Sequence, residues 1–525
     1  MFPTRASGIL LHPTCFPSRY GIGDLGQEAF DFVQFLYESD QRWWQILPLG
    51  PTSFGDSPYL SYSALAGNPL LISPDKLREV GLLSDSDLAY IPDFPLDSVN
   101  FDWVKEVKHP LYETACQNFH QNPPAALKTK FSAFCDRNQD WLDDYALFMA
   151  IKEAQGGSAW YDWPTDLKWR KPLTLVKAKT ELKDRLFYHQ FLQFCFFEQW
   201  LALRQYANDR HILIFGDIPI YVAHDSVDVW GHPEIFHLDP ETGDATLKAG
   251  VPPDYFSETG QLWGNPVYNW EAIQKENYQW WFSRFKGVLK LVDVVRIDHF
   301  RGFEAFWAVP GEEETAMNGS WLPAPGDEFF TALQKDLGEL PIVAEDLGVI
   351  TPEVEALRDK FEFPGMKLLH FAFDDNRANP FLPFNYPRNC VAYTGTHDNN
   401  TTVGWFTERD EYAQQRVLDF IGGVDSWGVH WSLIRLAMSS VANQAIFPFQ
   451  DILGLGADAR MNTPSSPEGN WGWRFRKEAL NPEMRDRLRY LTYLYGRQPV
   501  NETPIPSEET AEESETPAAD LPQAS

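Results

Sequence analysis

The sequence has few cysteines, five among 525 residues, and no two of them form a CxxC pair. An odd and scattered set of thiols does not build a disulfide framework or a cysteine-based zinc site. We therefore expect free thiols in a reducing compartment. The five are Cys15, Cys116, Cys135, Cys195 and Cys390.

The sequence also lacks a long uninterrupted hydrophobic run. The N-terminal segment has no apolar stretch of the length that a signal peptide needs. The most apolar later segment, 186–203, is interrupted by polar residues such as His189 and Glu198, whereas a membrane helix needs about 20 consecutive apolar residues. We expect no membrane partner and a cytoplasmic location.

Basic residues are scarce, with 44 Lys and Arg against 74 Asp and Glu, for a formal net charge of -30. This balance disfavours nucleic acids and anionic membrane surfaces as partners. Aromatic residues are abundant in contrast, with 20 Trp, 20 Tyr and 38 Phe. Flat rings stack on nucleobases or on sugar faces, and the negative charge leaves sugars as the better candidate ligands.

Eight short β-branched or aromatic runs end in Gly, Pro or Asp, and helical patterns lie between many of them. Alternating strands and helices predict an α/β fold, and eight strands favour a closed (β/α)8 TIM barrel over an open sheet. The predicted strands are 8–12, 44–49, 212–221, 294–300, 342–347, 366–372, 390–397 and 443–451. The clearest helical patterns between them are 27–37, 277–289, 329–337 and 353–360.

The strand spacing breaks once, between the second and third runs. Residues 66–209 carry Pro-bearing loops and strong helical patterns, notably 140–153 and 180–207, so we expect a mainly helical insertion there. It could form a wall of a substrate groove or serve only as packing. We expect residues 1–500 to form the barrel domain, and the acidic, Pro-containing tail 501–525 to be disordered.

A glycine motif offers an alternative function. The sequence GIGDLG at 21–26 matches GxGxxG, which suggests a nucleotide-dependent oxidoreductase. A dinucleotide fingerprint leaves a strand and enters a helix at once, but Pro13, Pro17 and Arg19 separate this motif from the preceding strand. Asp24 also stands where a phosphate would approach. A turn leading into a helix at Gln27 is the better interpretation.

The run VVRIDHFRGF at 294–303 places charge at the end of a core strand. Because side chains alternate along a strand, Val295 and Ile297 share the face that packs on outer helices. Arg296 and Asp298 share the other face, towards the barrel interior near its C-terminal mouth. The nearby positive charge favours the ionised form of Asp298, and an ionised carboxylate can act as a nucleophile.

Other predicted strands end with acidic residues in the same way. One run delivers Glu345 and Asp346, another His397 and Asp398, and an earlier one Asp217. In a (β/α)8 barrel these ends converge on one site. Retaining glycosyl transfer uses such a set: an ionised nucleophile and a protonated carboxyl about 5 Å away. A Mg²⁺ or Ca²⁺ site also uses clustered carboxylates; the adjacent basic residues Arg296, His299 and His397 argue against it.

Several long motifs are similar to those of the 4-α-glucanotransferases, the amylomaltase or disproportionating-enzyme family related to the α-amylases. The resemblance spans about residues 8–496 and implies a barrel enzyme without cofactor or metal that acts on maltooligosaccharides and linear α-1,4-glucans. The motifs are SPYLSYSALAGNPLL, GDIPIYVAHDSVDVW, GVPPDYFSETGQLWGNPVYNW, VVRIDHFRGF, VAEDLG, TGTHDNNTTVGW, ARMNTP and GNWGWR.

The resemblance assigns roles to individual residues. It implies that Asp298 is the nucleophile, Glu345 the general acid/base and Asp398 the transition-state stabiliser. The segment at about 250–265 resembles a lid loop that excludes water. Residues implied to bind the donor sugar are Tyr59, Asp217, Arg296 and His397, and those implied to line the acceptor groove are Tyr255, Phe256, Trp263, Asn265 and Asn462.

Two alternatives to transfer remain from the sequence. An α-glucan hydrolase uses the same three carboxylates, so the choice of transferase rests on the family motifs. A glycan-binding scaffold on an inactive barrel predicts the loss of a carboxylate, and all three are present. One departure from the family pattern follows Pro464, where Ser465, Ser466 and Pro467 stand in place of an expected glycine, which affects the predicted pose of Asn462.

Overall fold

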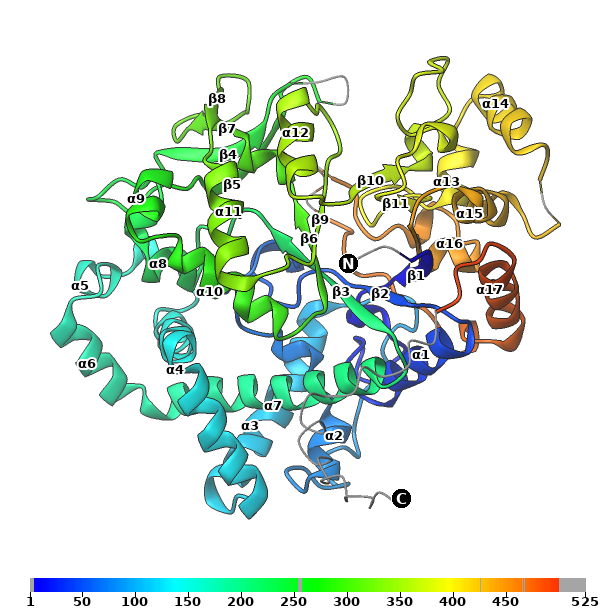
Figure 1. The fold of residues 1–525 in the computed structure, drawn as a ribbon. Coiled ribbons are helices and arrows are strands. Elements are labelled where there is room, and N and C mark those ends of the chain that lie inside the picture. The colour runs from blue at the N-terminus through cyan, green and yellow to red at the C-terminus, as the bar shows by residue number, and fades with distance from the viewer. Residues whose placement is uncertain (1–3, 254–256, 425, 465, 467, 500–525) are drawn as a thin grey trace, which may run out of the picture.

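The centre of the molecule is an eight-stranded parallel sheet whose spatial order follows the chain (Figure 1). This computed structural model describes residues 4–253, 257–424, 426–464, 466 and 468–499. Each predicted run overlaps one strand, so the predicted (β/α)8 barrel is confirmed. The strands are β1 (Ala6–Leu10), β2 (Trp43–Gln45), β3 (Leu213–Pro219), β6 (Val294–Asp298), β9 (Ile342–Ala344), β10 (Gly365–Leu368), β11 (Cys390–Tyr393) and β12 (Gln444–Pro448).

The barrel is nearly closed, and its seam lies between β9 and β10. The backbone N–H of Ala344 donates to Pro364 O at 2.9 Å across this seam. Further along the seam, a side chain takes the place of a backbone acceptor: the buried carboxylate of Asp346 accepts from the N–H of Met366 at 2.7 Å. Arg358 of α12 (Pro352–Lys360) pairs with the same carboxylate at 2.5 Å. Asp346 therefore closes the barrel and does not face its mouth as a second acid beside Glu345.

Several strands are shorter than predicted, which corrects the placement of the acidic residues. The runs 44–49, 342–347 and 390–397 leave the sheet at Gln45, Ala344 and Tyr393. The residues that follow remain largely buried because loops and outer helices cover them, so hydrophobicity does not mark where the sheet ends. Glu345, His397 and Asp398 therefore lie in loops after the strands and not on the strands themselves.

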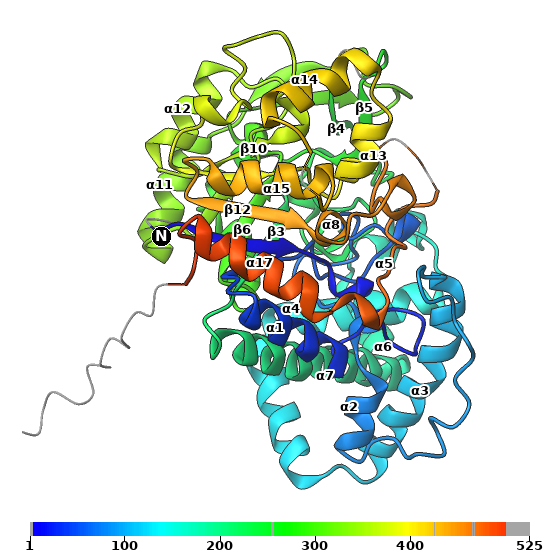
Figure 2. The same cartoon turned by 90° about the vertical axis from the view of Figure 1, so that its right-hand side faces the viewer.

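Helices surround the barrel, and the four clearest predicted ones are confirmed. The helix α1 (Gln27–Glu38) shows why: its apolar residues recur at helical spacing, and Phe32, Val33 and Leu36 are fully buried against the sheet. The others are α10 (Gln279–Leu289), α11 (Gly326–Leu337) and α12. Further outer helices are α8 (Val227–Gly231), α9 (Trp270–Lys275), α13 (Thr402–Thr407), α14 (Glu411–Ile421), α15 (Val429–Ser439), α16 (Phe449–Leu453) and α17 (Pro482–Leu494), several of which Figure 2 shows around β12.

The glycine-rich segment 21–26 leads into α1, and its own carboxylate occupies the position that a phosphate would need. Asp24 is buried and accepts from the N–H of Gly26 at 3.0 Å and from the Ser18 hydroxyl at 3.1 Å. The fully buried Lys108 lies 3.4 Å from the same carboxylate. The interpretation as a turn into a helix is confirmed, since these contacts leave the N–H group of Gly26 bonded within the chain.

Six helices lie between β2 and β3 in the chain, and in Figure 1 they cover the bottom and the left of the molecule. The long α4 (Ala125–Ala154) and α7 (Lys183–Asn208) pack on each other through aromatic rings; the ring centroids of Phe194 and Phe134 lie 5.9 Å apart. The predicted single helix 180–207 is wrong in one respect, because Leu182 leaves helical geometry and separates two helices. That the helical insertion 66–209 is a distinct subdomain stays a prediction. The helices are α2 (Pro74–Glu79), α3 (Phe101–Gln121), α4 (Ala125–Ala154), α5 (Thr165–Lys168), α6 (Pro172–Glu181) and α7 (Lys183–Asn208).

A four-stranded antiparallel sheet, which the sequence patterns did not reveal, lies beside the barrel. Its strands contain Gly250, Gly264 and Pro266, residues that are typical of turns, and this hid them. The expected lid loop 250–265 includes the end of one of these strands, the segment after it and nearly all of the strand 261–266, while Tyr255 and Phe256 lie outside the described residues. In spatial order the strands are β5 (Gln261–Pro266), β4 (Leu247–Val251), β7 (Ala305–Pro310) and β8 (Ser320–Pro323).

The cysteines and the apolar character of the helices were also predicted from the sequence. All five cysteines are free thiols, as predicted. Among the residues that the structure describes, no helix combines the length and the apolar character needed to cross a bilayer. The cytoplasmic location stays a prediction.

Candidate active site

A buried guanidinium joins two carboxylates at the C-terminal mouth of the barrel. The register between β3 and β6 places Asp217 directly beside Arg296. Nη1 of Arg296 donates to both carboxylate oxygens of Asp217, at 3.0 and 2.8 Å, and Nη2 lies 2.7 Å from Oδ1 of Asp298. Val295 and Ile297 are fully buried on the opposite face. The predicted parity of this strand is therefore confirmed.

Burial and charge oppose each other in this cluster. Burial disfavours the charge on Arg296, but the carboxylates of Asp217 and Asp298 outweigh it and hold the pKa of Arg296 above its ordinary value. Burial likewise raises the pKa of Asp217, and the charge of Arg296 counteracts that rise. The ion pairs thus allow Arg296 and Asp217 to be at least 95% buried inside the barrel mouth.

Glu345 lies in the loop after β9, beside the strand that carries Asp298. Its N–H donates to Ile297 O at 3.0 Å, which continues the pairing of the two strands. Its carboxylate accepts from the N–H groups of His299 and Leu347, both at 2.8 Å. Burial raises the pKa of Glu345 to about 8; the charge of Arg296 opposes this rise and that of Asp298 adds to it. This rise favours the protonated form of the carboxyl group at neutral pH.

The loop after β11 brings His397 and Asp398 to the same site. The hydroxyl of Tyr59 donates to Oδ2 of Asp217 at 2.8 Å and lies 2.8 Å from Nε2 of His397. Because the only hydroxyl proton is used on Asp217, Nε2 of His397 acts as the donor to Tyr59. The same nitrogen lies 3.3 Å from Asp398. The Tyr59 and His397 rings are nearly parallel, with centroids 5.3 Å apart, so one network links Asp398 to Arg296.

Of the predicted groove residues, Asn462 contacts this network directly, whereas Trp263 and Asn265 are held by other residues. The amide of Asn462 donates to Oδ1 of Asp398 at 2.6 Å, so its pose is defined despite the altered sequence that follows it. Trp263 of β5 meets the His299 ring edge-on at 4.8 Å. Asn265 is buried and donates to Val222 O at 2.8 Å, which ties the second sheet to the loop after β3.

The motifs that carry the resemblance contain further residues that the sequence did not single out. The Trp471 ring lies 5.8 Å from Tyr59 and 6.1 Å from His397. Arg460 donates to the backbone oxygens of Asp398 and Asn462, each at 2.6 Å. Their presence in GNWGWR and ARMNTP was the available signal. Their contacts with the site depend on the loop geometry, which no spacing rule gives.

The cluster contains the kinds of group that acid and nucleophilic catalysis on a glycosidic bond would use. A protonated carboxyl, an ion-paired carboxylate and a third carboxylate at the mouth of a (β/α)8 barrel are typical of enzymes that cleave glycosides. Within the described ranges, no three or more His, Cys, Asp or Glu side chains are grouped to hold a metal ion. That the site needs no cofactor stays a prediction.

Comparisons with known proteins agree with this class. A family model described as 4-alpha-glucanotransferase matches residues 11–480. A 4-alpha-glucanotransferase of Synechocystis sp. is 60% identical over 500 residues, which are 95% of this chain and 99% of the relative. One of Thermus thermophilus is 49% identical, over 92% and 97% of the two chains. The chain belongs to the 4-alpha-glucanotransferase family, as its motifs predicted, and it is an enzyme of the glucan-transferring class.

Solved structures support the same conclusion. The amylomaltase of Streptococcus agalactiae, solved in complex with acarbose, superposes with a TM-score of 0.91 at 41% identity, covering 94% of this chain and all of that one. An amylomaltase of Corynebacterium glutamicum has a TM-score of 0.74 at 18% identity, covering 94% of this chain and 74% of that one. The second comparison shows the fold alone.

The bridging role of the Tyr59 hydroxyl leads to a first prediction. Tyr59→Phe removes the bonds to Asp217 and His397 but keeps the ring, so kcat/KM for glucan transfer should fall about ten- to a hundredfold with the fold intact. Tyr90→Phe, at a 94% exposed site, is the control and should match the unmodified enzyme. Unchanged kcat/KM in Tyr59→Phe would contradict the network.

Proposed function

We propose that the enzyme moves a segment of an α-1,4-glucan to the 4-hydroxyl of another glucan or of glucose, by a retaining double displacement. The main support is the contrast between two carboxyl groups: burial raises the pKa of Glu345 to about 8, whereas Asp298 is ion-paired with Arg296 at 2.7 Å. Two carboxyls in such different environments fit the separate roles of acid and nucleophile.

The first step breaks the donor glycosidic bond. A carboxylate oxygen of Asp298 attacks the anomeric carbon, and the protonated Glu345 gives its proton to the departing glycosidic oxygen. The products are a glucosyl ester on Asp298, a free shortened glucan and an ionised Glu345. The N–H groups of His299 and Leu347 then stabilise the new negative charge on Glu345, since both already donate to its oxygens.

The second step reverses these roles. The ionised Glu345 takes the proton from the 4-hydroxyl of the acceptor, whose oxygen attacks the anomeric carbon and releases Asp298. A new α-1,4 bond forms, and the two inversions retain the configuration. Water in place of the acceptor gives hydrolysis, so the product depends on which hydroxyl reaches the intermediate.

The surrounding residues would bind and orient the sugar. Asp398, which accepts a hydrogen bond from Asn462, would accept further hydrogen bonds from sugar hydroxyls. It would also stabilise the positive charge that develops on the sugar ring. Asp217, Arg296, His397 and Tyr59 would line the donor subsite. Acarbose, the ligand of the S. agalactiae amylomaltase, is expected to bind this site.

The acceptor side would be formed by the second sheet and its lid. We assign Trp263 and Asn265 to this groove, with Tyr255 and Phe256 as lid residues that exclude water during transfer. Trp263 is half-buried and held by His299, so one part of its ring is available to a sugar face. The rival function, an α-glucan hydrolase, requires no such exclusion.

Incubation with maltotriose tests transfer against hydrolysis. Transfer should yield glucose together with a ladder of maltooligosaccharides longer than maltotriose, because each donor segment joins another chain. Asp298→Asn should yield neither while keeping its fold, whereas Asp359→Asn, at an exposed carboxylate, should behave as the unmodified enzyme. Glucose and maltose without longer products would overturn the proposal, and so would substantial activity in Asp298→Asn.

The pH dependence of kcat/KM tests the role of Glu345. The protonated form is needed to release the leaving group, so kcat/KM should be higher at neutral pH and should fall as the pH rises through about 8. Glu345→Gln should lower kcat about 10²- to 10⁴-fold and abolish this alkaline limb. A glycosyl fluoride donor, whose leaving group needs no proton, should restore formation of the intermediate. The same limb in Glu345→Gln would contradict the assignment.

A further inference from the structure

A buried carboxylate outside the proposed catalytic set lies behind the loop that carries His397 and Asp398. Asp451 stands in α16, just after β12, and is 1% exposed. Its Oδ1 accepts from the N–H of Thr402 at 2.6 Å. Its Oδ2 accepts from the hydroxyls of Thr402, at 2.7 Å, and Thr394, at 2.6 Å. These three bonds all join Asp451 to the same loop.

The two threonines mark the ends of that loop. Thr394 directly follows the last residue of β11, and Thr402 is the first residue of α13. His397 and Asp398 lie between them. A single side chain therefore holds both ends of the segment that presents two residues to the sugar.

His370 extends this connection to a third barrel loop. The single hydroxyl proton of Thr402 is donated to Asp451, so Nε2 of His370, 3.1 Å from that oxygen, must carry the proton of the next bond. Burial lowers the pKa of His370 to about 3, which keeps the ring neutral. The ring stacks on Trp405 of α13 with centroids 4.6 Å apart. The loops after β10, β11 and β12 are thus joined through one carboxylate.

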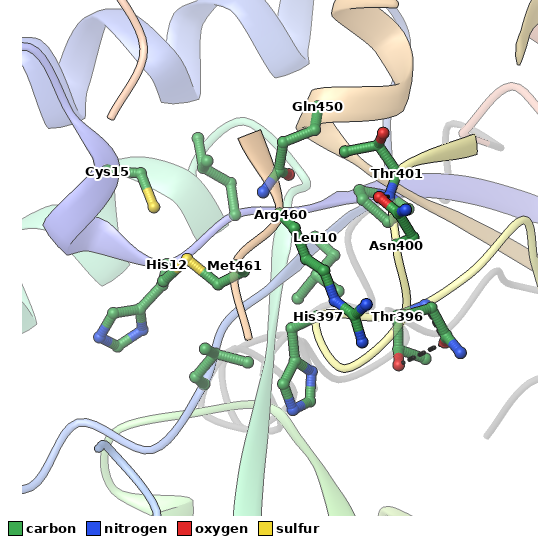
Figure 3. A pocket seen from close by; sticks show the side chains of 14 residues that line it. Leu10, His12, Cys15, Thr396, His397, Asn400, Thr401, Gln450, Arg460 and Met461 are labelled. Carbon is green, nitrogen blue, oxygen red and sulfur yellow. Dashed lines mark hydrogen bonds between the residues drawn. The ribbon is translucent and has the colours of Figure 1, made fainter. Parts of the chain in front are cut away.

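The interior of the loop has bonds of its own. Asn399 Oδ1 accepts from the N–H and the hydroxyl of Thr396, both at 2.9 Å. On the side shown in Figure 3, the loop borders a cavity of about 20 Å³, where His397 and Thr401 lie near Arg460 and the loops after β1 and β12. These contacts hold the middle of the loop, whereas the bonds to Asp451 tie its two ends to the helix that follows β12.

We propose that Asp451 is a positioning residue for the transfer reaction, acting through Thr394 and Thr402 on the placement of His397 and Asp398. The inference rests on the proposed function, in which Asp398 stabilises the transition state. A buried carboxylate is costly unless it is fully hydrogen-bonded, and here each of its bonds is to the catalytic loop. A shift of about 1 Å in a catalytic group can lower the rate about a hundredfold.

Matched substitutions test the proposal in the full-length enzyme. Asp451→Asn keeps the shape and removes the charge, and Thr402→Val removes the hydroxyl that Thr402→Ser retains. Asp451→Asn and Thr402→Val should lower kcat for maltotriose about ten- to a hundredfold, with a smaller change in KM, because the loss falls on the transition state. Thr402→Ser should retain nearly full kcat, and equal losses in Thr402→Ser and Thr402→Val would overturn the proposal.

A second, partly buried acid separates positioning from general stability. Asp293 stands just before β6, at the end opposite the site, and accepts from the N–H of Ile214 at 2.8 Å, from Asn208 at 3.0 Å and from Arg204 at 2.6 Å. Asp293→Asn should keep kcat per folded molecule, with folding followed by circular dichroism. If Asp451→Asn and Thr402→Val lose no more kcat per folded molecule than Asp293→Asn, the proposal fails.

Acarbose affinity, measured by calorimetry, shows whether Asp451 acts through the loop. Asp451→Asn should weaken acarbose binding in the otherwise unmodified enzyme. It should do so much less in an Asp398→Asn background, because both changes act through the contacts of Asp398 with the ligand. Equal losses in both backgrounds would overturn the inference. Full transfer activity in Asp398→Asn would instead contradict the proposed function, so the two failures are distinguishable.

Discussion

The arrangement of the site depends on the buried guanidinium of Arg296. A charge at this depth is stable only with close partners, and the β3–β6 register supplies Asp217 as one while strand parity supplies Asp298 as the other. Tyr59 then bonds to Asp217, and His397 to Tyr59. The two ion pairs of Arg296 within the sheet therefore set the positions of Asp217 and Asp298, and Tyr59 links them to His397.

The three carboxylates are held by different means. Asp298 ends a strand, so the sheet itself fixes it. Glu345 and Asp398 follow their strands in loops, and each needs further bonds, from the N–H groups of His299 and Leu347 in one case and from Asn462 in the other. The loop of Asp398 is also tied to Asp451. The sheet therefore places the proposed nucleophile, and hydrogen bonds to the loops place its two partners.

The sequence predicted what depends on period and on long motifs. Strand parity gave the shared face of Arg296 and Asp298, and eight apolar runs gave the barrel. It could not show where β9 or β11 stops, because residues beyond them stay buried under loops, nor the antiparallel sheet, whose strands contain Gly250 and Pro266. The closing role of Asp346 and the position of Trp471 depend on contacts distant in sequence, which neither period nor spacing encodes.

In the proposed mechanism, Arg296 prepares Asp298 as the nucleophile and Glu345 is the acid. Trapping is the most direct measurement: Glu345→Gln is incubated with a maltotriosyl fluoride donor and its peptides are examined by mass spectrometry. The fluoride leaves without a proton, and loss of the base slows the second step, so the intermediate should accumulate. The expected adduct is a maltotriosyl ester on Asp298. No adduct, or an adduct on another residue, would contradict it.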